Sequence, residues 1–307
     1  MSSAARWLAC LAVLLACAPA QAARLYRWKD AQGITQYGDQ PPQASADAEV
    51  DVIRFRNPPG TLARLRIEPL ATRYQVWADN PGPGPVQVEV SFRQQHNLLA
   101  SPALPLRKVL PAHGSVLLSS LILTDPLGGA QFDLKMDAMP GDPAAKPFDF
   151  RYRLPFDEAA LRVDQGPGGR FSHNDLQNRD AIDFAVPEGT PILAARAGVV
   201  LQVESDFDKA GLDREVYGGR ANFIRILHED GTMALYAHLK PEGVLVRTGQ
   251  SVREGQQIGL SGNTGFSTAP HLHFVVQVNA GMALRSVPVR MVGPMGELLF
   301  PSAPAGP

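Results

Sequence analysis

Cysteine is absent from most of this chain. The two cysteines, Cys10 and Cys17, both fall within residues 1–22, a stretch typical of an export signal. Arg6 supplies its positive start, an apolar run follows, and Ala20 and Ala22 form a small-x-small cleavage site. A mature chain without cysteine can use neither disulfides nor thiolate ligands. An alternative stays open, because the residues before Cys17 loosely resemble a lipobox, and lipidation there would attach the chain to a membrane.

The sequence also lacks an excess of charge, aromatic residues and long apolar runs. Its 29 Lys and Arg oppose 30 Asp and Glu, so no basic surplus favours nucleic acid as a partner. A membrane-spanning helix requires about 18 consecutive apolar residues, and no segment beyond the signal contains such a run. The 28 Gly, 27 Pro and 7% aromatics favour many turns and short strands over long helices. A length of 307 residues predicts two or three domains and leaves the oligomeric state open.

Three mainly β regions follow the predicted signal. In residues 23–58, runs at 25–28 and 34–37 around a Gly-containing turn predict a hairpin, and the Tyr-x-Trp-x-Asp and Tyr-x-Asp-x-Pro-Pro patterns resemble the DUF4124 domain of Gram-negative envelope proteins. Residues 43–49 look like a linker. Alternating apolar and polar residues with regular turn signals over 61–156 predict a β-sandwich. Residues 164–290 again predict strands and turns, with a long surface loop at 205–220, and residues 291–307 are expected to be a tail.

The third region holds an unusual concentration of histidine. Five of the seven histidines lie between His173 and His273. His271 and His273 are two residues apart in a run of strand formers, so both side chains project from one face of the strand, opposite Leu272 and Phe274. Such a pair alone is more typical of partly exposed strand histidines than of a reaction site, and its meaning depends on the residues around it.

Nearby residues could complete a metal site. A catalytic zinc site uses three protein ligands, often His with a carboxylate, and leaves a position open for water. Asp183 stands between apolar Ile182 and Phe184, so on a strand it faces away from them, although a turn-capping Asp is the alternative. Tyr236 and His238 are expected to share a strand face, as a phenol that stabilises an oxyanion beside a general acid or base.

Residues 173–278 resemble the catalytic domain of lysostaphin/LytM-type zinc endopeptidases, peptidase family M23. Five blocks occur in the family's order, including the segments around Asp183, His238 and the pair His271 and His273. The resemblance implies an antiparallel sheet groove, one Zn²⁺ per chain, Asp183 and His273 as metal ligands, and His238 and His271 as non-ligand histidines that handle protons.

One departure concerns the first ligand. The family's His-x-x-x-Asp pattern would place this ligand at Arg179, whose guanidinium cannot bind zinc. We expect His173, ten residues before Asp183, to take this role across a longer loop, with Asp175 and Asp180 as weaker substitutes. His228 is expected in a hairpin turn outside the site.

The sequence therefore predicts a periplasmic or secreted zinc metalloendopeptidase of the Gram-negative envelope, which hydrolyses peptide cross-links or stem peptides of peptidoglycan. The alternative is a non-enzymatic, degenerate relative that binds and activates a cell-wall amidase. Such relatives typically lack ligand or catalytic histidines, which this chain keeps. A lipoyl-type carrier is excluded because no Met-Lys attachment site occurs.

Overall fold

In a computed structural model, the chain divides into two compact units, residues 1–56 and 57–307. The structure describes the strand backbone at 24–29, 35–38 and 51–54, and residues 61–157, 161–293 and 296–300. The predicted export signal and both cysteines lie outside these residues. Across the part that is described, no helix has the length and apolar character needed to span a bilayer.

The first unit contains a small antiparallel sheet in the order β2-β1-β3. Strand β1 (Arg24–Lys29) pairs with β2 (Thr35–Gly38), as the predicted hairpin requires. The other edge of β1 pairs with β3 (Asp51–Arg54), which follows the stretch expected to be a linker. The hairpin is therefore the first part of a three-stranded sheet.

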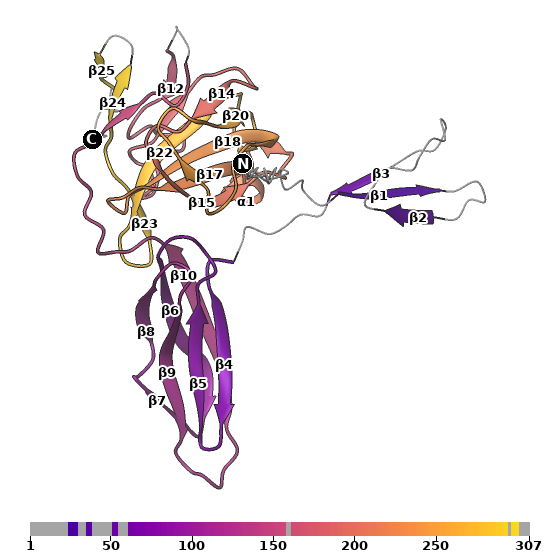
Figure 1. The fold of residues 1–307 in the computed structure, drawn as a ribbon, viewed down its shortest axis with the longest axis vertical. Helices are drawn as coiled ribbons and strands as arrows, with labels where there is room; N and C mark the ends of the chain where they lie inside the picture. The colour runs from indigo at the N-terminus through magenta and orange to yellow at the C-terminus, as the bar shows by residue number, and fades with distance from the viewer. Residues whose placement is uncertain are drawn as a thin grey trace, which may run out of the picture. The chain divides into compact units, whose positions relative to one another are not determined.

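The second unit begins with the predicted β-sandwich (Figure 1). One sheet has the order β4-β5-β9-β7 and the other β10-β6-β8. Inward-facing residues of both sheets, such as Ala78, Val88 and Leu118, form its buried core, because alternate positions along each strand share a face. The strands are β4 (Arg64–Leu70), β5 (Arg73–Asp79), β6 (Val86–His96), β7 (Leu98–Ser101), β8 (Leu106–Leu110), β9 (Ser115–Leu123) and β10 (Gln131–Pro140).

The β-sandwich ends earlier in the structure than the predicted boundary at residue 156. The last sandwich strand ends at Pro140, whereas Tyr152 and Phe156 lie in the core of the following region. Strand β11 (Arg151–Arg153) pairs in parallel with β24 (Arg290–Gly293), which pairs with β25 (Gly296–Leu298). Part of the expected C-terminal tail therefore belongs to a sheet. The sequence does not predict this strand, because its pairing partner lies about 140 residues earlier and no local pattern reveals the pairing.

Two hydrogen bonds connect the sandwich to the region that follows. The Asn279 side chain donates to the Gly141 carbonyl at 3.0 Å, immediately after β10. The Met282 amide donates to the side-chain oxygen of Gln87, on β6, at 2.8 Å. Asn279 and Gln87 are both buried, so these bonds form away from water.

A large, largely antiparallel sheet dominates residues 163–286, as predicted (Figure 1). Its main path is β12-β13-β22-β18-β17-β15-β19, and β14, β20 and β23 pair off this path. These strands are β12 (Val163–Gln165), β13 (Ile182–Phe184), β14 (Pro191–Leu193), β15 (Gly198–Glu204), β17 (Asn222–Leu227), β18 (Met233–Val244), β19 (Ser251–Val252), β20 (Gln257–Ser261), β22 (Leu272–Asn279) and β23 (Leu284–Ser286).

The two faces of this sheet differ in chemistry. One face packs a core that includes Ile182, Ile224, Tyr236 and Phe274. The alternate residues face a groove of about 510 Å³, whose lining includes Asp183, Arg225, Leu235, Ala237 and His273. Period-two alternation therefore separates a structural face from a face available for ligands.

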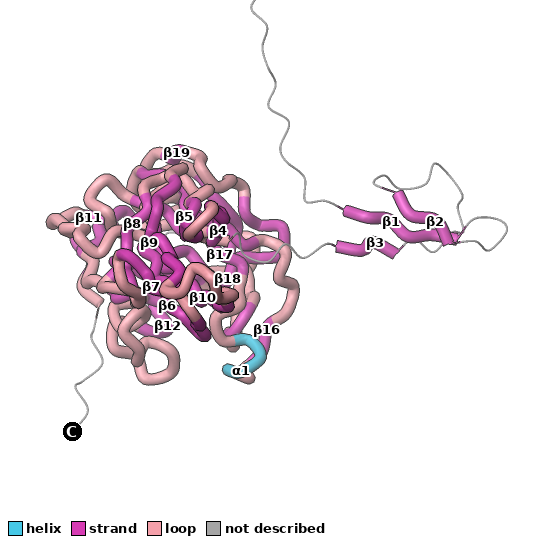
Figure 2. Tube along the Cα trace, turned by 90° about the horizontal axis from the view of Figure 1, so that it is seen from below, coloured by secondary structure: helices cyan, strands magenta, loops and turns pink. Residues whose placement is uncertain are grey.

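Residues 205–220 are here called the wall segment, because residues between 214 and 220 line one side of this groove. The segment was predicted to be a loop, but it contains strand β16 (Ala210–Gly211), which pairs with β21 (Gly265–Phe266), and helix α1 (Arg214–Tyr217). Asp213 caps α1, because its carboxylate accepts from the amides of Glu215 and Val216. Figure 2 shows α1 in cyan, the single α-helix among the described residues.

Candidate metal centre

Strand register places two of the predicted ligands side by side. Asp183 on β13 pairs directly with His273 on β22, while their neighbours Ile182 and Phe274 point into the core. On its other edge β22 pairs with β18, where Ala237 lies opposite His273. The carboxylate and the imidazole therefore meet on the groove face because both strands alternate in phase.

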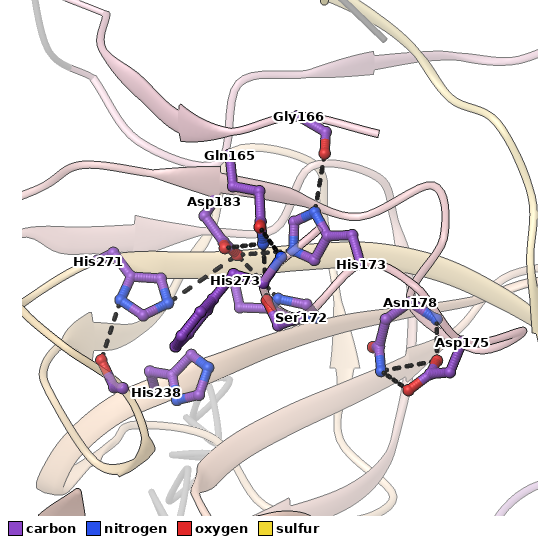
Figure 3. Close-up of polar contacts among 12 residues, drawn as sticks. Gln165, Gly166, Ser172, His173, Asp175, Asn178, Asp183, His238, His271 and His273 are labelled. Carbon is purple, nitrogen blue, oxygen red and sulfur yellow. Dashed lines mark hydrogen bonds and ion pairs between the residues drawn. The ribbon is translucent and has the colours of Figure 1, made fainter. Parts of the chain in front are cut away.

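The third predicted ligand arrives from the loop between β12 and β13. His173 is fully buried, and its Nε2 lies 3.2 Å from Oδ1 of Asp183. Nδ1 of His273 lies 2.9 Å from the same oxygen. The structure thus brings together His173, Asp183 and His273, whose ligand atoms all lie within 4.8 Å of one another (Figure 3). Arg179, the position of the family pattern, is exposed.

Two neighbours orient these side chains. Nδ1 of His173 lies 2.9 Å from the Gly166 carbonyl, which can only accept, so Nδ1 carries the proton and Nε2 keeps its lone pair. The Gln165 amide donates to Asp183 Oδ2 at 3.1 Å and to the Ser172 hydroxyl at 2.7 Å. No local sequence pattern predicts Gln165, because its position opposite Asp183 comes from pairing between β12 and β13.

The electrostatics of the cluster suit a cation. Burial alone would raise the pKa of Asp183, but His173 and His273 outweigh it and hold that pKa well below its usual value. Burial would lower the pKa of His173, yet the Asp183 carboxylate raises it overall. Among the described residues, the buried Nε2 of His173 forms no hydrogen bond and faces only the Asp183 carboxylate at 3.2 Å. A buried carboxylate that faces an imidazole lone pair without a proton between them fits a divalent cation with nitrogen and oxygen ligands.

His238 and His271 lie together beside this cluster. Their ring centroids are 4.5 Å apart, and Nε2 of His271 is 3.9 Å from Asp183 Oδ1. Nδ1 of His238 donates to the Thr264 carbonyl at 2.6 Å, and Nδ1 of His271 to the Ala269 carbonyl at 2.8 Å. Each ring therefore presents an unprotonated Nε2 in its neutral form. Burial first, and then the charges of His271 and His273, lower the pKa of His238, so it is neutral at neutral pH.

The expectation that Tyr236 shares a face with His238 is wrong. Tyr236 is fully buried in the core, where its hydroxyl accepts from the Ala195 amide at 2.8 Å. Burial raises the pKa of Tyr236 well above its usual range. The alternation fails because His238 adopts a φ of +63°, which turns its side chain to the groove. Tyr236 thus faces away from the four histidines and Asp183.

Aromatic and cationic side chains build the groove's rim. Phe171 and Phe266 stack with ring centroids 5.2 Å apart, and the Arg214 guanidinium of the wall segment lies 5.0 Å from the Phe266 ring. His228 lies outside this groove, as predicted, in the turn between β17 and β18, with Nδ1 2.8 Å from the Ala197 carbonyl.

Comparisons with known proteins agree with these resemblances. Residues 177–284 match "Peptidase family M23" and residues 11–59 match "Domain of unknown function (DUF4124)", so both predicted resemblances are confirmed. The M23 match includes Asp183, His238, His271 and His273 and begins after His173. The case for His173 therefore depends on the geometry described above.

Curated relatives are similar over part of their length. An uncharacterized metalloprotease of Haemophilus influenzae is 36% identical over 118 residues, 38% of this chain and 22% of that protein. The peptidoglycan DD-endopeptidase ShyA of Vibrio cholerae is 42% identical over 92 residues, 30% of this chain and 18% of ShyA. The chain thus spans about a fifth of these relatives. Among solved structures, lysostaphin from Staphylococcus simulans is 31% identical, with a TM-score of 0.31, over 39% of this chain and 44% of lysostaphin.

Proposed function

We propose that this chain, which carries a peptidase family M23 domain at residues 177–284, is a zinc metalloendopeptidase that hydrolyses peptide cross-links or stem peptides of bacterial peptidoglycan. One observation carries the proposal: a buried His173, Asp183 and His273 cluster meets two further histidines with free Nε2 atoms at the floor of a groove. Metal-assisted hydrolysis requires this combination of metal ligands and neighbouring groups that transfer protons.

The three clustered residues would hold one zinc ion per chain. When bound, zinc supplies a Lewis acid that polarises a scissile carbonyl and lowers the pKa of water to about 7. Gln165 and the Gly166 carbonyl fix Asp183 and His173 in place, which limits reorganisation when a substrate binds.

His238 and His271 have the state needed to move a proton. Because Nδ1 of each ring donates to a carbonyl, the neutral ring presents Nε2 to the groove, and the lowered pKa of His238 keeps that ring neutral. One accepts the proton of the attacking water, and either can donate a proton to the departing amine or a hydrogen bond to the developing oxyanion. The bonds to Thr264 and Ala269 hold both rings in the required tautomer.

The names of the relatives support the proposed substrate class. ShyA, which is 42% identical to this chain over 92 residues, carries the name peptidoglycan DD-endopeptidase. Peptidoglycan lies outside the cytoplasmic membrane, so the proposal requires export to the periplasm or beyond. Residues 1–22, read as an export signal, meet that requirement.

Two measurements on the purified protein test this proposal. We expect stoichiometric zinc by elemental analysis and release of soluble muropeptides from purified sacculi. His173→Ala and Asp183→Ala should each lose zinc and activity. His271→Ala should keep zinc and lose at least about a hundredfold in rate, as for removal of a general acid or base.

His96→Ala provides the matched control, because His96 is exposed at the end of a sandwich strand. This variant should keep both zinc and activity. Wild-type protein that binds no zinc and releases nothing from sacculi would overturn the proposal. Zinc retained in His173→Ala would remove His173 from the ligand set.

A further inference from the structure

Arg225 is a buried cation without a counter-ion. Its side chain projects from β17 on the groove face, between the core residues Ile224 and Ile226, and only 8% of the residue is exposed. Within residues 61–157, 161–293 and 296–300 it forms no ion pair, and its single hydrogen bond joins Nη1 to the Gln277 side-chain oxygen at 2.6 Å. Its buried Nε has no partner, and burial lowers the pKa of Arg225 to about 10.

The guanidinium lies in the floor of the same groove as the metal cluster. Arg225 pairs with Leu235 on β18, which pairs with Val275 on β22, and all three strands run beside one another. Its partner Gln277 is four residues beyond His273 on β22, which corresponds to about 13 Å between Cα atoms. A peptide whose scissile bond lay at His273 could place a group near Arg225 two to four residues away.

Neutral groups cannot balance a charge in such a place. An arginine removed from water without a partner is strongly unfavourable, and the Gln277 oxygen offers one neutral acceptor for five N–H donors. By contrast, Arg196, another buried arginine of this domain, is paired with Asp230 at 2.9 Å. The remaining donors of Arg225 therefore suit an anion that arrives through the groove, and a carboxylate matches the planar guanidinium with two parallel bonds.

We propose that Arg225 is a specificity residue that binds a free carboxylate of the peptide substrate. The inference deepens the proposed function and depends on it, because it concerns the same groove. Stem peptides present carboxylates at a chain end and on side chains, and both have the chemistry that the guanidinium recognises. A site built around such a pair rejects analogues that lack the charge, because the arginine is then left buried and unpaired.

A double-mutant cycle between enzyme and substrate tests this assignment. The zinc-loaded protein is assayed on a synthetic cross-linked stem-peptide dimer with all carboxylates free, and on dimers amidated at the C-terminal carboxylate or at one side-chain carboxylate. Wild-type kcat/KM should fall at least about tenfold for one amidated dimer, mainly through KM. The dimer that shows this loss identifies the source of the carboxylate.

The enzyme side of the cycle uses Arg225→Gln and Arg225→Lys. Arg225→Gln should lose a similar factor on the free dimer and almost nothing more on the sensitive amidated dimer, because both changes remove one interaction. Arg225→Lys keeps the positive charge and a donor to Gln277 but loses the planar guanidinium that can bind a carboxylate with two parallel bonds. It should therefore retain part of the preference for the free dimer over the amidated dimer. The exposed Arg247→Gln is the matched control and should leave every ratio unchanged.

The outcomes separate this inference from the proposed function. If wild-type protein hydrolyses the free dimer but no amidation lowers kcat/KM, or if amidation and both Arg225 substitutions act independently, Arg225 binds no carboxylate and the assignment is overturned. Isothermal titration with the free and amidated product peptides, on zinc-loaded wild-type protein, gives a second measurement that needs no turnover. A wild-type protein inactive on every dimer and on sacculi would instead contradict the proposed function.

Discussion

At the scale of single residues, Tyr236 shows how a change of backbone conformation can mislead a sequence pattern. Its hydroxyl accepts from the Ala195 amide within the core, opposite the histidine cluster. We therefore expect Tyr236→Phe to keep kcat and to cost about 1–2 kcal/mol of stability, because the buried Ala195 amide loses its acceptor. Sacculus hydrolysis and urea unfolding measure the two quantities. A large loss of kcat in a folded variant would restore a catalytic role for the phenol.

His228 gives a prediction on pH. The pKa of His228 is lowered to about 4, chiefly by burial; the Ala197 carbonyl and Asp230 oppose this shift and the charge of Arg196 adds to it. Between pH 6.5 and 4 the unfolded chain binds the proton and the folded chain does not, so folding stability falls as pH falls. From pH 7 to 5 this residue accounts for a loss of about 2 kcal/mol.

A substitution isolates that contribution. His228→Asn keeps a donor for the Ala197 carbonyl but cannot titrate, so its unfolding free energy should depend less steeply on pH over this range. Urea unfolding at pH 5 and 7 provides the comparison, with the exposed His113→Asn as the control. Equal slopes in wild type and His228→Asn would refute the assignment.

Several site residues could be predicted from the sequence. Alternation alone indicated that Asp183 and His273 face away from their apolar neighbours, and the histidine count pointed to this region. No sequence pattern indicated the role of Gln165 or the absence of a charged partner for Arg225. Their environments depend on strand pairing between residues that are distant in the chain.

At the scale of elements, the wall segment is held to the sheet where β16 meets β21. Gly265 begins β21 with a φ of +85°, and a Cβ there would collide with the Arg220 carbonyl. Gly265→Ala should therefore lower stability by about 1–3 kcal/mol more than the strain of a positive φ alone. It should also lower activity, because the collision displaces the wall of the groove.

Gly189 supplies the matched control. Its φ is +89°, but apart from its chain neighbours no atom of the described residues lies within 4 Å of where a Cβ would stand. Gly189→Ala thus carries the backbone strain, about 1 kcal/mol, without the collision. Thermal unfolding and sacculus assays of both variants give the comparison. Indistinguishable variants would show that the wall segment tolerates displacement.

The elements also show where prediction from sequence stopped. The sandwich and the hairpin followed from period-two alternation and turn residues, which act locally. Helix α1 was not predicted, because a single helical turn is too short to show periodicity in the sequence. The capping residue Asp213 is its only local indication. The pairing of β11 with β24 escaped because parallel strands far apart in sequence leave no shared local pattern.

At the scale of the whole molecule, metal binding should be visible as folding stability. A ligand that binds only the folded state stabilises it by about 4 kcal/mol at a thousand times its dissociation constant. Thermal unfolding of the zinc-loaded protein should therefore occur well above that of protein treated with a chelator. His173→Ala should show no such difference, and the His96→Ala control should show all of it. A wild-type unfolding temperature that is insensitive to chelation would contradict a metal centre at this cluster.

The bond between Asn279 and the Gly141 carbonyl has a mechanical consequence. Strand β22 carries His273 near its start and Asn279 at its end, so the sandwich is attached to the strand that bears the chemistry. A pull on Asn279 along the direction of β22 would load this strand in shear across the five residue pairs that it shares with β18. Shear distributes the load over the whole ladder at once, whereas peeling would break the pairs one by one. Tension that enters at Asn279 in this direction would therefore be carried by several residue pairs before it reached His273.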